Sequence, residues 1–142
     1  MRVCITKALS GQLTAERLDP NILIARFSEW KAGDEYSSYF FGKDALGVNS
    51  SVLRHVHMIP LHDADQLASW NRAWRRRPPA RKTSDRYLFY CDGGARHGYL
   101  LIYVVGDPGA HDFLSSPETR QLLAAFEQCA DQFFHFGTFT VC

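Results

Sequence analysis

The sequence predicts one α+β domain, residues 1–142, in which helices pack against one side of an antiparallel β-sheet. Segments with the two-residue period of a strand alternate with segments that have the period of a helix. The last three predicted strands follow one another with short links, which favours antiparallel pairing. A chain of 142 residues, 46% of them hydrophobic, is also long enough to bury a core within a single domain.

The N-terminal part is predicted to form a strand and two helices. Residues 1–8 alternate β-branched and other side chains, as a strand does. Thr14 is expected to cap a short helix, and Asp19-Pro20 has the N-cap and first-turn proline that begin a second helix. The buried face of that helix is expected to consist of Leu23, Phe27 and Trp30.

The middle of the chain is predicted to hold an irregular segment and three strands. Residues 33–51 are expected to be irregular, with a short helix at 43–46. Residues 52–61 alternate well enough for a strand. A hairpin follows later, with strands at 86–92 and 99–105, and the second strand is apolar on both faces, as a central strand is.

Two further helical segments are predicted. A helical stretch is expected at 64–74, before the break at Pro78-Pro79. Ser116-Pro117-Glu118 has the pattern of a helix start. The terminal helix is expected to bury one apolar face, made of Leu122, Phe126, Cys129 and Phe133. The main elements then follow the order strand, two helices, three strands, helix.

The charge distribution is more informative than the net charge of +1, which neither requires nor excludes a polyanionic partner. Seven cations lie within a single stretch of fifteen residues: Arg72, Arg75, Arg76, Arg77, Arg81, Lys82 and Arg86. The planar fork of arginine suits phosphate, so one interpretation of this basic stripe is a phosphate-binding surface. The alternative interpretation is a solvated loop without a partner.

The localisation is inferred from targeting patterns that the sequence lacks. The first ten residues do not have the pattern of a signal peptide, and the apolar run around residues 100–105 is too short to cross a bilayer. We therefore expect a cytoplasmic protein without a membrane partner.

The four cysteines are widely spaced and include no CxxC pair, which argues against a zinc site or a redox motif. In a reducing compartment we expect Cys4, Cys91 and Cys129 to be small buried apolar residues and Cys142 to be a free thiol.

Histidines mark the first candidate site, on the predicted strand 52–61. Alternation places His55 and His57 on one face and Arg54 on the other. His55 and His57 could bind a metal ion together with His62. The other interpretations are partly exposed sheet histidines, or acid–base chemistry by an imidazole that titrates near neutrality.

Three more residues are candidates for function. Asp85 either bonds backbone amides in a turn or takes part in catalysis. Tyr90 lies on the strand face opposite Tyr87 and Phe89, where it could stack on a base, donate a proton or pack in the core with its hydroxyl bonded. His111 follows the last strand, which is a reasonable catalytic position, and its alternative role is in capping the final helix.

A set of motifs along the chain resembles the YafO family of toxins from type II toxin–antitoxin pairs. The motifs, in chain order, are MRV, LTAE, FGKDAL, the Arg54 and His57 pair, KTSD with the YC that follows, LLI and His111. The resemblance runs from Met1 to about Phe133 and is weak over residues 62–80. The order of the predicted elements is also that of small RelE-like and ParE-like toxins.

The resemblance implies a toxin that stops translation by cutting mRNA on the ribosome without a metal ion or other cofactor. Its partners would be a cognate antitoxin, rRNA and mRNA. Such cleavage uses the ribose 2′-hydroxyl as nucleophile, and it needs a base, an acid and cations beside the phosphate. The alternatives are a non-catalytic inhibitor that binds the ribosome or the antitoxin, and a metal-dependent hydrolase built on His55, His57 and His62.

Roles for individual residues follow from this chemistry. His57 and His111 are the predicted proton-transfer residues. Phosphate charge would be stabilised by Arg54, Arg81 and Lys82, and Tyr90 would orient a base or transfer a proton. The predicted RNA-binding residues are Arg75, Arg76, Arg77, Arg81, Lys82 and Arg86.

Overall fold

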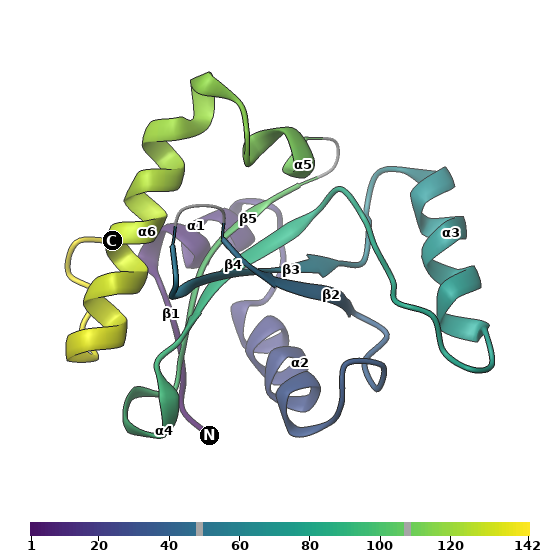
Figure 1. Ribbon diagram of the computed structural model, residues 1–142, viewed down its shortest axis with the longest axis horizontal. Helices are drawn as coiled ribbons and strands as arrows, with labels where there is room; N and C mark the ends of the chain where they lie inside the picture. Colours follow the sequence, from purple (N-terminus) through teal and green to yellow (C-terminus); the bar gives the residue numbers. More distant parts are fainter. Residues whose placement is uncertain (48–49, 107–108) are drawn as a thin grey trace.

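In the computed structural model, which describes residues 1–47, 50–106 and 109–142, five strands form one mixed sheet with helices on both faces (Figure 1). The strands are β1 (Val3–Ile5), β2 (Phe41–Leu46), β3 (Leu53–Met58), β4 (Tyr87–Asp92) and β5 (Tyr99–Val105). Their order across the sheet is β1-β5-β4-β3-β2. The predicted α+β class is confirmed.

Most of the sheet is antiparallel, as predicted, because β2 to β5 pair in that sense. The exception is the edge strand β1, which is parallel to β5. Two helices separate β1 from β2, so no hairpin fixes the direction of β1.

The helices are α1 (Lys7–Ala15), α2 (Pro20–Ala32), α3 (Ala64–Arg75), the short α4 (Gly94–His97) and α5 (Ala110–Phe113), and α6 (Arg120–Phe136), which follows a 3₁₀ turn at Pro117–Thr119. In Figure 1, α2 and α6 lie on opposite sides of the sheet, and α3 stands apart where the chain leaves β3. The prediction of helices on one side only is therefore wrong. The second layer arises because β4 and β5 are apolar on both faces and each face needs a cover.

Alternation along the strands divides the core into two clusters. Phe89 and Ile102 face α5 and α6, where they meet Phe113, Phe126 and Phe133. Leu88 and Tyr90 face α1 and α2, where they pack with Leu9, Phe27 and Trp30. The predicted buried face of α2 is thus confirmed, and Asp19 caps this helix by accepting a hydrogen bond from the amide of Asn21 at 2.9 Å.

The segment predicted to be irregular at 33–51 is irregular over 33–40, but the short helix predicted at 43–46 is wrong, because β2 occupies 41–46. Residues 48 and 49, in the same predicted segment, lie outside the described residues. Long-range contacts hold β2: it pairs with β3, and the amide of Lys43 donates to the carbonyl of Lys82 at 2.9 Å. A Cβ at Gly42 would lie 2.2 Å from that carbonyl oxygen, so this close approach requires glycine.

The first helix also begins earlier than predicted. Thr6 caps α1, since its hydroxyl accepts from the amide of Leu9 at 3.1 Å, and Thr14 lies inside the helix. The chain can bend this early because β1 is short. The hydroxyl of Thr6 also donates to the carbonyl of Ile102 at 2.7 Å, which ties the start of α1 to the central strand.

Cys129 is not a free thiol. It forms a disulfide with Cys142, with the Cα atoms 5.4 Å apart, so the prediction of a free Cys142 is wrong, while Cys129 is buried as predicted. Gly137, at φ 72°, ends α6 and lets the tail turn back along it. Sequence spacing alone gave no sign of this turn. Cys91 is buried and free, as predicted, and Cys4 is free and half-buried.

The buried face of α6 differs by one residue from the prediction. Leu122 is 45% exposed, while its neighbour Leu123 is 5% exposed and packs with Phe126, Ala130 and Phe133. Positions 123, 126, 130 and 133 fit helical spacing, and 122 lies to one side of this stripe.

The two adjacent leucines provide a matched test of the fold. We expect Leu123→Ala to lower the free energy of unfolding by about 2–5 kcal/mol, because it empties a packed site. We expect Leu122→Ala to change it by less than about 0.5 kcal/mol. Urea denaturation of the two variants measures both values, and equal losses would contradict this orientation of α6.

Candidate functional site

The predicted site residues lie in two groups on opposite faces of the sheet. Arg54 is opposite Tyr90 across the β3–β4 pair, and both face α2. His57 is opposite Tyr87 and faces the side covered by α5 and α6. The alternation predicted for the histidines and Arg54 is confirmed. One catalytic centre cannot therefore use His57 and Tyr90 together.

An open polar cleft of about 470 Å³ contains both predicted proton-transfer residues, His57 and His111. The cleft is bounded by α3, the segment before β4, and α5. Its other lining residues are Gln66, Ser69, Thr83, Ser84, Asp85, Tyr87 and Asp112. We call it the histidine cleft.

Asp85 is the residue that brings His111 to the cleft. One carboxylate oxygen accepts from the amide of His111 at 2.6 Å, and the other accepts from the amide of Gly109 at 2.6 Å. The backbone carbonyl of Asp85 also accepts from the amide of Ala110 at 3.3 Å. Of the two roles considered for Asp85, the structure has the backbone-bonding one, here across the cleft.

The ring of His57 is held as a neutral imidazole. Its Nδ1 accepts a hydrogen bond from the amide of Ser84 at 2.9 Å, so the ring hydrogen lies on Nε2. Burial lowers the pKa of His57 to about 4, and nearby His55 and Lys43 act in the same direction. At neutral pH His57 is therefore a hydrogen-bond donor through Nε2 and a weak base.

The face toward α2 carries a compact ionic network around Tyr90. The Tyr90 hydroxyl donates to Asp44 at 2.7 Å and accepts from Lys31 Nζ at 3.0 Å and Arg54 Nε at 3.2 Å. Asp44 also pairs with Arg54 Nη2 at 3.2 Å and with Lys31 Nζ at 3.6 Å.

This network leaves Tyr90 little capacity for proton transfer. Burial and the Asp44 carboxylate raise the pKa of the Tyr90 phenol far above its usual value, and its oxygen already makes three hydrogen bonds. Lys31 and Asp44 were not predicted as partners of Tyr90. In the sequence, Lys31 and Asp44 are marked only by being polar residues among apolar ones, which is a weak sign of a site.

Two of the residues predicted to contact RNA are buried. Lys82 is 2% exposed, and its Nζ lies 5.4 and 5.1 Å from the ring centres of Trp70 and Trp74. Burial lowers the pKa of this amine. Arg86 is 5% exposed, and its Nη1 donates to the carbonyl of Ile59 at 3.3 Å. Neither side chain is presented to a phosphate in this conformation.

The other predicted RNA-binding residues are exposed. Arg75, Arg76 and Arg77 lie at the C-terminal end of α3, whose N-terminal half supplies Gln66 and Ser69 to the histidine cleft. Arg81 is exposed but its Nε pairs with Glu35 at 2.6 Å. The basic stripe is therefore exposed at the end of α3 and buried at Lys82 and Arg86.

In residues 1–47, 50–106 and 109–142, no three His, Cys, Asp or Glu side chains lie close enough together to hold a metal ion. His55 and His57 are neighbours with ring centres 6.4 Å apart, and His62 is exposed outside the strand. None of the helices in these residues has the length and apolarity needed to cross a membrane.

Residues 28–135, more than half of the chain, match the family model described as Toxin YafO, type II toxin–antitoxin system. No curated protein and no solved structure gives a match. The match defines the class of the protein, which is a toxin of a type II toxin–antitoxin system. Within that class, the chain belongs to the YafO toxin family, and membership implies an antitoxin partner.

The state of His57 predicts a pH dependence of stability. The unfolded pKa is about 6.5 and the folded pKa is about 4, so the unfolded chain binds more protons between these values. The stabilisation is complete above about pH 6.5 and is lost as the pH falls toward 4, by up to about 3 kcal/mol.

The variant His57→Gln removes this titration. We expect its unfolding free energy to fall less than that of the wild type between pH 7.5 and 4.5, by about 2 kcal/mol. Urea denaturation at both pH values measures the difference. Parallel losses in the two proteins, or a His57 ring that NMR shows to be protonated at pH 6, would contradict the assignment.

Proposed function

We propose that this toxin inhibits translation as a ribosome-dependent endoribonuclease that cuts mRNA without a metal ion, with the histidine cleft as its active site. The observation that carries the proposal is that two residues predicted independently from the sequence, His57 and His111, line the same open cleft. The partners would be the ribosome and mRNA in the cytoplasm, together with the antitoxin.

The chemistry that suits the cleft is attack of a ribose 2′-oxygen on the adjacent phosphorus. The bond to the 5′-oxygen breaks, the 2′-proton passes to a base, and the leaving 5′-oxygen takes a proton from an acid or from water. His111 is exposed in the cleft and is the candidate base. The Nε2 hydrogen of neutral His57 is suited to bond a phosphate oxygen as negative charge develops on it.

This set is too small to supply the whole mechanism. One general acid or base contributes about 10²- to 10⁴-fold in rate, so proton transfer by His111 leaves most of the barrier to positioning and electrostatics. A ribosome that holds mRNA with the 2′-oxygen in line with the leaving oxygen would supply that positioning. The proposal therefore accounts for dependence on the ribosome.

The exposed end of α3 supports a path for the nucleic acid. Gln66 and Ser69 are three residues apart, and continuing that spacing leads to Arg72 and then to Arg75 and Arg76. An RNA strand that lies in the cleft would thus meet cations along the same helix. Their guanidinium groups suit phosphates of mRNA or rRNA.

The second candidate function is inhibition by occupancy, without cleavage. The observation that favours it is the neutral, partly engaged ring of His57 together with the separation of Arg54 and Tyr90 from the cleft. In that case the same arginines would bind the ribosome, and the cleft would not take part in chemistry.

Primer extension on a defined mRNA tests the first function. New ends are expected only with translating ribosomes, and His111→Ala is expected to slow their formation by about 10²- to 10⁴-fold. His135→Ala, which alters an exposed histidine on α6 outside the cleft, is the control and should cut as the wild type does.

The other outcomes separate the remaining interpretations. Equal cutting of naked and ribosome-bound mRNA would contradict ribosome dependence. A block of translation without new ends would favour occupancy, and full activity in His111→Ala would remove the cleft as the active site.

The arginines make a separate prediction about salt. In the double variant Arg75→Ala/Arg76→Ala, we expect weaker ribosome binding and a fall of roughly two in the slope of log affinity against log salt, one for each phosphate that the variant no longer neutralises. The control replaces two exposed arginines elsewhere, Arg96 and Arg120, by alanine. If both double variants show the same salt slope as the wild type, the end of α3 does not contact phosphate.

A further inference from the structure

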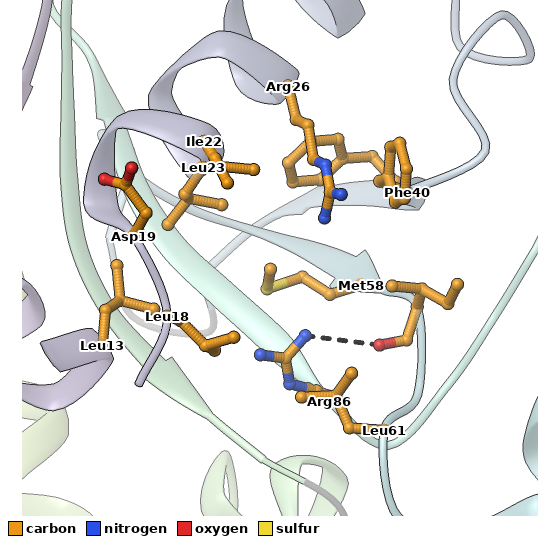
Figure 2. Close-up of a pocket in the computed structure, with 12 residues that line it drawn as sticks. Leu13, Leu18, Asp19, Ile22, Leu23, Arg26, Phe40, Met58, Leu61 and Arg86 are labelled. Carbon is orange, nitrogen blue, oxygen red and sulfur yellow. Dashed lines mark hydrogen bonds between the residues drawn. The ribbon is translucent and has the colours of Figure 1, made fainter. Parts of the chain in front are cut away.

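A second concave site lies on the sheet face opposite the histidine cleft. It is a groove of about 180 Å³ between the α1–α2 turn, α2 and the neighbouring ends of β2, β3 and β4 (Figure 2). Its floor is the apolar cluster under α1 and α2, represented by Leu13, Leu23, Phe41 and Met58. We call it the α2 groove, and none of its lining residues has a role in the proposed chemistry.

The rim of the α2 groove exposes three large apolar side chains. Ile22 is 50% exposed, Leu61 is 48% exposed and Leu18 is 39% exposed, and all three lie around the same opening. The volume is close to that of an engineered apolar cavity of ~150 Å³ that binds benzene. The groove can therefore accept one large apolar side chain, with further contacts along the rim.

An exposed arginine, Arg26, brings positive charge to the rim of the groove, and a buried one, Arg86, lies near it. Figure 2 shows Arg26 reaching from α2 across Phe40, and its Cζ lies 3.7 Å from the ring centre. Arg86 lies across the opening, anchored by its bond to the carbonyl of Ile59. The one acidic lining residue, Asp19, uses a carboxylate oxygen to cap α2. The exposed charged residues of the lining are thus Arg26 and Asp19, and Asp19 is engaged at the start of α2.

These features match a segment that carries a large apolar side chain with an acidic side chain beside it. Ile22 and Arg26 are one helical turn apart on α2, so an apolar contact and an ion pair can form next to each other. Family membership already implies that one protein binds this toxin specifically, namely the antitoxin. We propose that the α2 groove is a docking site for an apolar and acidic segment of the cognate antitoxin.

This placement separates neutralisation from toxicity, because the groove and the histidine cleft face opposite sides of the sheet. Substitutions at the groove rim should then weaken antitoxin binding and leave the toxin active. The inference rests on the family and not on the proposed RNA cleavage, so binding can be measured without ribosomes or RNA.

The test measures the affinity of the purified cognate antitoxin for full-length toxin variants by titration calorimetry. Ile22→Asp puts a carboxylate among the apolar side chains of the groove, and we expect affinity to fall on the order of 30-fold or more, as for a residue that contributes much of the binding energy. Arg26→Glu reverses one charge, and we expect a slower association rate and a weaker dependence on salt.

The matched controls lie on the other face of the molecule. Leu122→Asp alters a side chain that is 45% exposed on α6, and Arg120→Glu alters an exposed arginine at the start of that helix. Both should bind antitoxin as the wild type does. Circular dichroism and an unfolding curve for each variant show whether it is folded before binding is compared.

Growth provides the second readout. Cells that express Ile22→Asp should stop growing as with the wild type, and co-expressed antitoxin should rescue them poorly. Wild-type affinity in both Ile22→Asp and Arg26→Glu would overturn the proposal. So would a wild-type toxin that sediments as a dimer while folded Ile22→Asp is a monomer with unchanged antitoxin affinity, since the groove would then bind a second copy of this chain.

Discussion

The antiparallel pairing of β3 with β4 is the constraint on which the rest of the structure depends. The register places Arg54 opposite Tyr90 and His57 opposite Tyr87, and successive side chains point to opposite faces of the sheet. A shift by one residue would exchange the two faces and expose both core clusters. The register therefore fixes which polar residues meet, and with it the positions of the histidine cleft, the Tyr90 network and the α2 groove.

Charge is distributed unequally between these sites. Around Tyr90, two cations and one carboxylate are held together at hydrogen-bond distances, which suits a structural role. In the histidine cleft, His57 is neutral, the carboxylate of Asp85 is bound to backbone amides, and the cleft remains open. The site that holds the ion pairs is thus the less suited to proton transfer. A residue can transfer a proton only if its ionisable group is not already held by other hydrogen bonds, so residue type alone does not determine its role.

Local sequence patterns predicted the parts of the fold that local interactions determine. Asp19-Pro20 marked the start of α2, the alternation around His57 was confirmed, and the backbone-bonding role considered for Asp85 is present. The features that were missed depend on residues distant in the chain: β2 needs β3 and the carbonyl of Lys82, Tyr90 needs Lys31 and Asp44, and Cys129 needs the turn at Gly137. The burial of Lys82 and Arg86 was missed for the same reason. A run of cations in sequence does not indicate that Lys82 will be buried beside Trp70 and Trp74, or that Arg86 will bond the carbonyl of Ile59.

The measurement that tests the central claim most directly is the structure of this toxin on a ribosome programmed with mRNA that carries a 2′-O-methyl group and cannot be cut. The account predicts that the phosphate next to the modified ribose lies in the histidine cleft, within hydrogen-bond reach of His57 Nε2 and His111. An mRNA that instead lies against the face of Arg54 and Tyr90, with the histidine cleft turned to solvent, would contradict it.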